Sequence, residues 1–124
     1  MTRLVHRPAA GGERTVAEDV RVADSFLARG RGLMFRRSFR GDCLAFPFGK
    51  SVTRSLHMLF VPFDIDAVWV ESDEVTAVER LTAWTGTARA RGDTVYELPA
   101  GAADGVEPGD GLVLDDDATR RNRE

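Results

Sequence analysis

The fold is decided by the stretch Val95-Tyr96-Glu97-Leu98-Pro99-Ala100-Gly101, which continues through Gly105-Val106-Glu107-Pro108-Gly109-Asp110. Its first five residues are rich in β-branched, aromatic and aliphatic side chains, which is typical of a strand, and Pro99 ends that strand. The three glycines and two prolines of residues 99–110 then restrict the backbone to a closely specified turn. Because residues 112–114 are again apolar, the segment predicts two strands joined by a shaped turn.

A second informative stretch is Gly30-Arg31-Gly32-Leu33-Met34-Phe35-Arg36. It follows a short apolar segment, residues 26–29, that Asp24 or Ser25 can cap as a helix. The two glycines supply flexible backbone that can end this helix. We expect the Leu-Met-Phe run after them to plug the hydrophobic core.

The rest of the chain shows short β-type segments at roughly ten-residue spacing. Residues 2–7 and 14–23 flank a Pro-Gly turn and predict an N-terminal hairpin. The other predicted strands lie at residues 43–46, 55–60, 65–70, 75–81 and 94–98. Such spacing favours a mainly antiparallel sandwich or barrel, because a parallel sheet would need crossover helices.

These motifs together resemble the DUF192 (UPF0127) family of small, uncharacterised bacterial and archaeal proteins. Residues 32–36 reproduce its Gly-Leu-Met-Phe-Arg turn, and residues 97–110 resemble its Glu-x-x-x-Gly segment ending in Gly-Asp. Between them, other family positions are matched by Met58, Ile65-Asp66, Glu79, Leu81 and Trp84. The sequence departs from the family pattern at His57, at Leu59-Phe60-Val61 and at Asp64.

The resemblance implies a β-rich α+β domain related to jelly-roll sandwiches, with one or two short helices packed on it. It covers residues 13–114, so we expect an N-terminal strand and turn over residues 1–12 and a charged, disordered tail over residues 115–124. It implies no cofactor and no known reaction.

The amino-acid composition argues against some classes of function. The chain has 124 residues, 43% of them hydrophobic and 30% charged, as in one soluble globular domain. It contains no apolar run long enough to span a membrane and no secretory leader, so we expect a cytoplasmic protein without a membrane partner. The net charge of −3 argues against nucleic-acid binding. The lone cysteine, Cys43, is expected to be a buried apolar residue.

Five residues are candidates for binding a polar or anionic small molecule: Arg31, Arg36, Trp84, Glu97 and Asp110. The arginines belong to a cluster of five within residues 29–40 that could hold a carboxylate or phosphate, or could form a solvated basic face. Trp84 could stack on a sugar or fold back over the sheet. An inward Glu97 would need a partner such as Arg31 or Arg36, in a purely structural pair or beside a ligand.

The only plausible acid–base couple is His57 with Asp66, since His6 is expected in a weakly ordered N-terminus. A nucleophile would have to be Ser55 or Cys43, and neither lies in a nucleophile-elbow pattern. One strand histidine with scattered carboxylates is also a poor metal site, so we expect no metal.

Three functions therefore stay open. The first is a β-sandwich binding module for a small polar or anionic ligand, with carbohydrate as one class. The second is an interaction or assembly module using the apolar run at residues 59–63. The third is a hydrolase-like enzyme using His57 and Asp66. The oligomeric state is left open.

Overall fold

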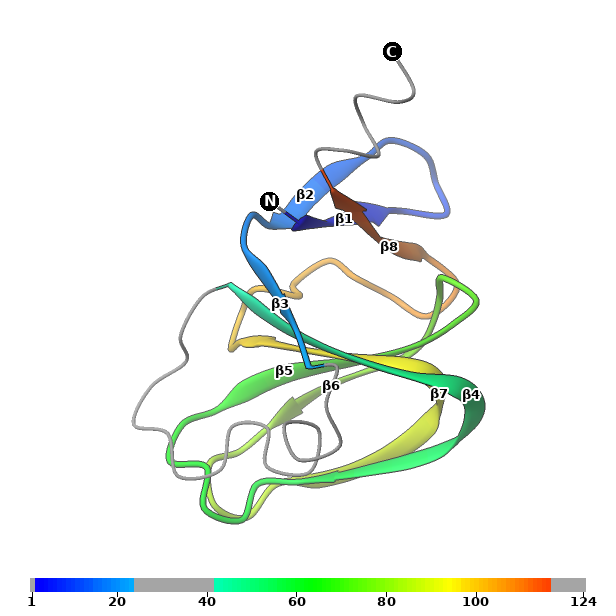
Figure 1. Ribbon diagram of the computed structural model, residues 1–124. Coiled ribbons are helices and arrows are strands. Elements are labelled where there is room, and N and C mark those ends of the chain that lie inside the picture. Colours follow the sequence, from blue (N-terminus) through cyan, green and yellow to red (C-terminus); the bar gives the residue numbers. More distant parts are fainter. Residues whose placement is uncertain (1, 24–41, 117–124) are drawn as a thin grey trace.

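A computed structural model describes residues 2–23 and 42–116 (Figure 1). This part of the chain forms eight strands: β1 (Thr2–Arg7), β2 (Arg14–Ala17), β3 (Val20–Val22), β4 (Cys43–His57), β5 (Ile65–Glu71), β6 (Glu74–Leu81), β7 (Thr87–Pro99) and β8 (Gly111–Asp116). They belong to one sheet in the order β2-β1-β8-β6-β5-β7-β4-β3. The predicted β-rich fold is confirmed.

The N-terminal hairpin is confirmed over residues 2–17, because β1 pairs antiparallel with β2. Residues 20–22, which were expected in its second arm, form the separate strand β3. The hairpin is part of the main sheet, since β1 pairs along its whole length with β8. Asp115, which we expected in the tail, lies in β8, is buried, and binds Arg3 with an N···O distance of 3.1 Å. Residues 115 and 116 thus belong to the sheet and not to a tail. Residues 117–124 lie outside the described part of the chain.

The longest strands, β4 and β7, form a ribbon that bends sharply in the middle (Figure 1). The β4 register shifts between Pro47 and Val52, where Gly49 adopts a φ of 82°. Opposite this bulge, a Cβ on Gly92 would lie 2.9 Å from the backbone oxygen of Val70, so only glycine permits the close approach. The strands predicted from the sequence did not include residues 47–54 and 82–93. Instead, most of both segments is strand.

The bend divides the interior into two hydrophobic cores on opposite faces of β5. Val68 and Val70 face the first core, which β1, β3 and β8 help to cover. Ala67 and Trp69 face the second core, between the main sheet and the far half of the β4–β7 ribbon. The Trp69 indole N–H donates to the Arg54 carbonyl at 2.9 Å, which ties β5 to the folded-under ribbon. The result is a sandwich-like arrangement built from one continuous sheet.

One strand pair differs from the expected antiparallel pattern. β3 pairs parallel with β4, with Val20 opposite Cys43. The connection from Val22 to Cys43 is long enough for the crossover that a parallel pair requires. The helix expected before Gly30 and the core plug at residues 33–35 lie outside the described residues. Within residues 2–23 and 42–116, no helix could cross a membrane.

Candidate functional site

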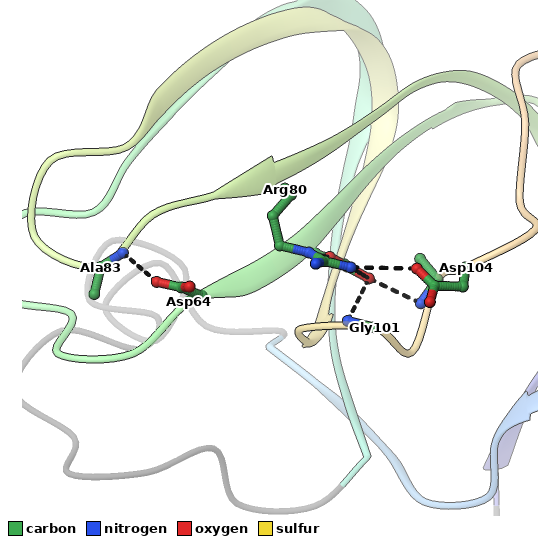
Figure 2. A network of polar contacts seen from close by, with 7 residues as sticks. Asp64, Arg80, Ala83, Gly101 and Asp104 are labelled. Carbon is green, nitrogen blue, oxygen red and sulfur yellow. Dashed lines mark hydrogen bonds and ion pairs between the residues drawn. The ribbon is translucent and has the colours of Figure 1, made fainter.

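Asp66 at the start of β5 anchors the turn after β7. Its buried carboxylate accepts hydrogen bonds from the backbone N–H groups of Gly101 at 2.9 Å and Ala103 at 3.0 Å. Arg80, its cross-strand partner on β6, binds the same carboxylate and also reaches Asp104, as Figure 2 shows. Two family motifs, Ile65-Asp66 and the Glu-x-x-x-Gly segment ending at Gly101, therefore meet in one structural contact.

Asp110 anchors the other end of the same turn. Its carboxylate accepts hydrogen bonds from the N–H groups of Ala9 and Glu107 and lies 2.7 Å from Nε2 of His6. These contacts, with the His6 hydrogen bond contributing most, lower the pKa of Asp110 to about 2. The carboxylate predicted to bind a ligand is already engaged within the protein.

His6 is buried in β1, so its expected place in a weakly ordered terminus was wrong. The Arg14 Nε–H donates to His6 Nδ1 at 3.0 Å. An Nδ1 atom that accepts must carry no proton, so Nε2 carries the proton and donates it to Asp110. His6 thus joins the N-terminal hairpin to the β7–β8 turn and is not available as a catalytic base.

Glu97 on β7 is the unusual polar residue of the interior. It is only 8% exposed, and no described residue forms a hydrogen bond with its buried Oε2 atom. Its row neighbours on the same sheet face are Leu44 on β4 and Ala67 on β5. Burial in this apolar setting raises the pKa of Glu97 to about 7. The prediction of an inward Glu97 is supported by this position, while Arg31 and Arg36, its expected partners, lie outside the described residues.

Trp84 lies on the end of the ribbon, where two loops are joined. The loops are residues 58–64 between β4 and β5 and residues 82–86 between β6 and β7. Hydrogen bonds connect them from Met58 N to Gly86 O and from Trp84 N to Val61 O. A third runs from Ala83 N to Asp64 Oδ1, as Figure 2 shows. We call these two joined loops the tip.

The tip exposes two aromatic side chains whose backbone conformations are strained. Trp84 is 56% exposed and Phe60 is 41% exposed, and both adopt left-handed backbone conformations, with φ values of 68° and 63°. Bulky residues rarely adopt this conformation, which persists only where the surrounding structure enforces it. The alternative that Trp84 folds back over the sheet is therefore wrong. The strained Phe60 was not recognisable from sequence, because only the tertiary hydrogen bonds fix its conformation.

Gly86 makes this tip geometry possible. A Cβ atom there would lie 2.7 Å from both the N and O atoms of Thr82. We expect Gly86→Ala to lower the free energy of unfolding by about 1–3 kcal/mol, because backbone atoms would have to move. Urea unfolding followed by tryptophan fluorescence measures this change. Thr85→Ala, in the same turn, is the control and should stay within about 0.5 kcal/mol of wild type; equal effects of both substitutions would contradict the close approach.

His57 and Asp66 do not form the predicted catalytic couple. His57 lies opposite Thr87 and Asp66 lies opposite Leu98, so the two are 98 − 87 = 11 residues apart along β7. His57 is exposed, and its Nδ1 accepts a hydrogen bond from the Leu59 N–H at 3.3 Å. The Asp66 carboxylate already binds Arg80 and the backbone N–H groups of the turn after β7.

The candidate nucleophiles are no better placed. Cys43 is fully buried, and burial raises the pKa of its thiol far above the usual range. Ser55 is exposed on the same ribbon face as His57, and no hydrogen bond joins the two side chains. Among the residues that the structure describes, no three His, Cys, Asp or Glu side chains gather where they could hold a metal ion.

Solved structures with a similar fold place this architecture among known proteins. A crystal structure described as a "putative transcription regulator" (R01717) from Sinorhizobium meliloti 1021 superposes with a TM-score of 0.75 and 24% identity, covering 92% of this chain and 94% of that one. A protein of unknown function from Novosphingobium aromaticivorans DSM 12444 has a TM-score of 0.73 and 21% identity, covering 90% and 83%. At these identities the likeness shows the fold alone.

Sequence comparison identifies the family as well as the fold. The UPF0127 protein PH1112 of Pyrococcus horikoshii is 30% identical over 94 residues, which are 73% of this chain and 80% of that protein. The model of the DUF192 family, described as "Uncharacterized ACR, COG1430", matches residues 7–114. The matched residues include Asp66, the turn at residues 100–110, the buried Glu97 and the tip. The chain therefore belongs to the DUF192 (UPF0127) family.

Proposed function

We propose that this protein is a small, non-catalytic binding module whose tip takes a polar or anionic carbohydrate. The exposed, conformationally constrained Trp84 carries the proposal. An aromatic side chain on a rigid backbone loses less conformational entropy when a ligand stacks on it than one on a mobile loop. The three hydrogen bonds between the two loops supply that rigidity.

A polar group for ligand recognition lies at the base of the tip. His57 precedes the loop at residues 58–64 and is exposed. Because its Nδ1 accepts from Leu59, the neutral ring presents an Nε2–H donor to solvent. A surface that offers both an apolar ring face and a hydrogen-bond donor suits a sugar, which has both C–H faces and hydroxyl groups.

Intrinsic fluorescence tests this function directly. The chain has two tryptophans, and Trp69 is fully buried, so a ligand-induced change reports on Trp84. We expect a panel of neutral sugars and sugar acids to include at least one saturable response. Trp84→Ala should weaken that binding by about tenfold or more, since an anchoring aromatic commonly contributes over 1 kcal/mol.

The matched control is Trp84→Phe, which retains an aromatic face and should bind more tightly than Trp84→Ala. Binding of these variants is followed by calorimetry, because they lack the reporter. The absence of any response across the panel by wild type, in both fluorescence and calorimetry, would overturn the proposal.

A protein-interaction function is the second candidate, because the tip also exposes Leu59 at 53%. With Phe60 and Trp84 it places three large apolar side chains on adjoining loops, and such patches commonly mark interfaces. If the tip mediates self-assembly, sedimentation velocity should show concentration-dependent association that Leu59→Ser weakens. Val22→Ser, at an exposed apolar residue on β3, is the control and should have no effect. A monomer at all concentrations would exclude self-assembly through the tip.

A further inference from the structure

The outer face of the far half of the β4–β7 ribbon carries a regular array of polar side chains. Three cross-strand pairs share this face: His57 with Thr87, Ser55 with Arg89, and Thr53 with Arg91. All six residues are exposed. The alternate residues, including Leu56, Ala88 and Ala90, pack against the second core, which fixes the orientation of the array.

The strand segments that form this outer face contain no acidic residue. The protein has twenty acidic residues, yet none lies within residues 43–63 or 81–92. Arg91 binds Glu71 of β5 at 2.9 Å while its side chain stays 63% exposed. Arg89 forms no hydrogen bond or ion pair with any residue of the described part of the chain. In a protein of net charge −3, this face is a local cationic strip.

The strip continues from the tip. Met58 N donates to Gly86 O immediately beyond the His57–Thr87 pair, and Trp84 follows in the adjoining turn. Alternate residues of a strand are about 6.7 Å apart, so Thr87, Arg89 and Arg91 span about 13 Å. A ligand confined to the tip would leave this length of surface unused.

We propose that the outer ribbon face is a track for an acidic oligosaccharide, with Trp84 stacking on a terminal sugar and Arg89 binding a carboxylate further along the chain. The inference rests on the proposed function of the tip. An arginine fork matches the two oxygens of a carboxylate, and the hydroxyls of Thr53 and Ser55 can exchange hydrogen bonds with sugar hydroxyls.

A single-stranded nucleic acid fits the face less well. Affinity for nucleic acid comes mainly from neutralising many phosphates, and it usually requires several stacking aromatics along a basic groove. This strip has two arginines, one of them shared with Glu71, and its exposed tryptophan lies only at one end. Uronic-acid sugars carry one carboxylate each and match this sparse charge better.

The test compares four probes by calorimetry at constant ionic strength: galacturonate, tetragalacturonate, maltotetraose and tetrauridylate. We expect tetragalacturonate to bind at least about tenfold more tightly than galacturonate or maltotetraose, because a charge-assisted hydrogen bond commonly contributes over 1.4 kcal/mol. Arg89→Ala should remove about tenfold of that affinity, and Arg89→Lys should restore only part of it. Arg21→Ala, at an exposed arginine on β3, should change nothing.

The outcomes separate this inference from the proposed tip function. If galacturonate and tetragalacturonate bind equally and Arg89→Ala has no effect, the track is wrong while the tip function stands. If tetrauridylate binds most tightly and depends on Arg89, the ligand class is wrong. If wild type binds none of the carbohydrates and none changes its fluorescence, the proposed function fails with the track. Unfolding temperatures of the Arg89 variants should match wild type, because the side chain is exposed.

Discussion

Asp66→Ala is expected to lower the free energy of unfolding by about 2–4 kcal/mol, because it removes a buried carboxylate that several hydrogen-bond donors share. The carboxylate accepts hydrogen bonds from Gly101 and Ala103 N–H groups and binds Arg80. Alanine would leave the backbone donors of this turn without acceptors, and the Ala103 bond is buried. Urea unfolding measures the loss.

The neighbouring Asp64 provides the matched control for Asp66. It also accepts one backbone hydrogen bond, from Ala83 at 2.8 Å, but it is exposed. Water can replace its carboxylate, so Asp64→Ala should cost about 1 kcal/mol or less. If the two substitutions had equal effects, Asp66 would not be the anchor of the β7–β8 turn.

Glu97→Gln is expected to stabilise the protein at pH 8 by up to about 3 kcal/mol and to change little at pH 4. Burial raises the pKa of Glu97 from 4.5 to about 7. Between these values the folded protein holds a proton that the unfolded chain has released, so stability decreases as pH rises from 4.5 to 7. The free-energy cost of ionising the buried Glu97 is therefore absent below pH 4.5 and complete above pH 7. Glutamine removes it because the amide does not ionise.

Urea unfolding of wild type and Glu97→Gln at several values between pH 4 and pH 8 measures this difference. The control is Glu79→Gln, on the same sheet face beyond Ala67 but exposed, which should show no such pH dependence. The opposite result, in which Glu97→Gln destabilises the protein even at pH 8, would show that Glu97 is ionised against a cation. Arg31→Ala and Arg36→Ala would then identify whether one of the sequence-predicted partners supplies that charge.

The acidic residues of the family motifs hold the fold together, a role that their sequence alone does not reveal. Asp66 and Asp110 each hold one end of the turn at residues 100–110, where Gly101 and Gly109 adopt φ values of 95°. The sequence did predict a closely shaped turn there, because glycine and proline constrain the backbone locally. It could not predict which distant carboxylates hold the turn, because Asp66 lies 35 residues before Gly101.

The ribbon was harder to recognise. Gly49 and Gly92 looked like strand ends, although both lie within long strands that bend. Thr87 to Arg91 has polar and alanine residues in alternation, which is a strand period, but alanine is a weak β-former and its burial is decided only by the opposing core. Because the extended ribbon was not recognised, the separation of His57 from Asp66 could not be judged from their closeness in sequence.

The sequence by itself determined that this is a β-rich domain of the DUF192 family, with an N-terminal hairpin, a shaped turn before the last strand and an inward Glu97. These features follow from local conformational preferences and from the burial of apolar side chains. Only the tertiary structure decided that Trp84 is exposed at a strained tip, that Asp110 is occupied by His6, and that Arg89 lies on the exposed outer face of the ribbon. Such properties depend on which distant segments meet, and local sequence does not encode them.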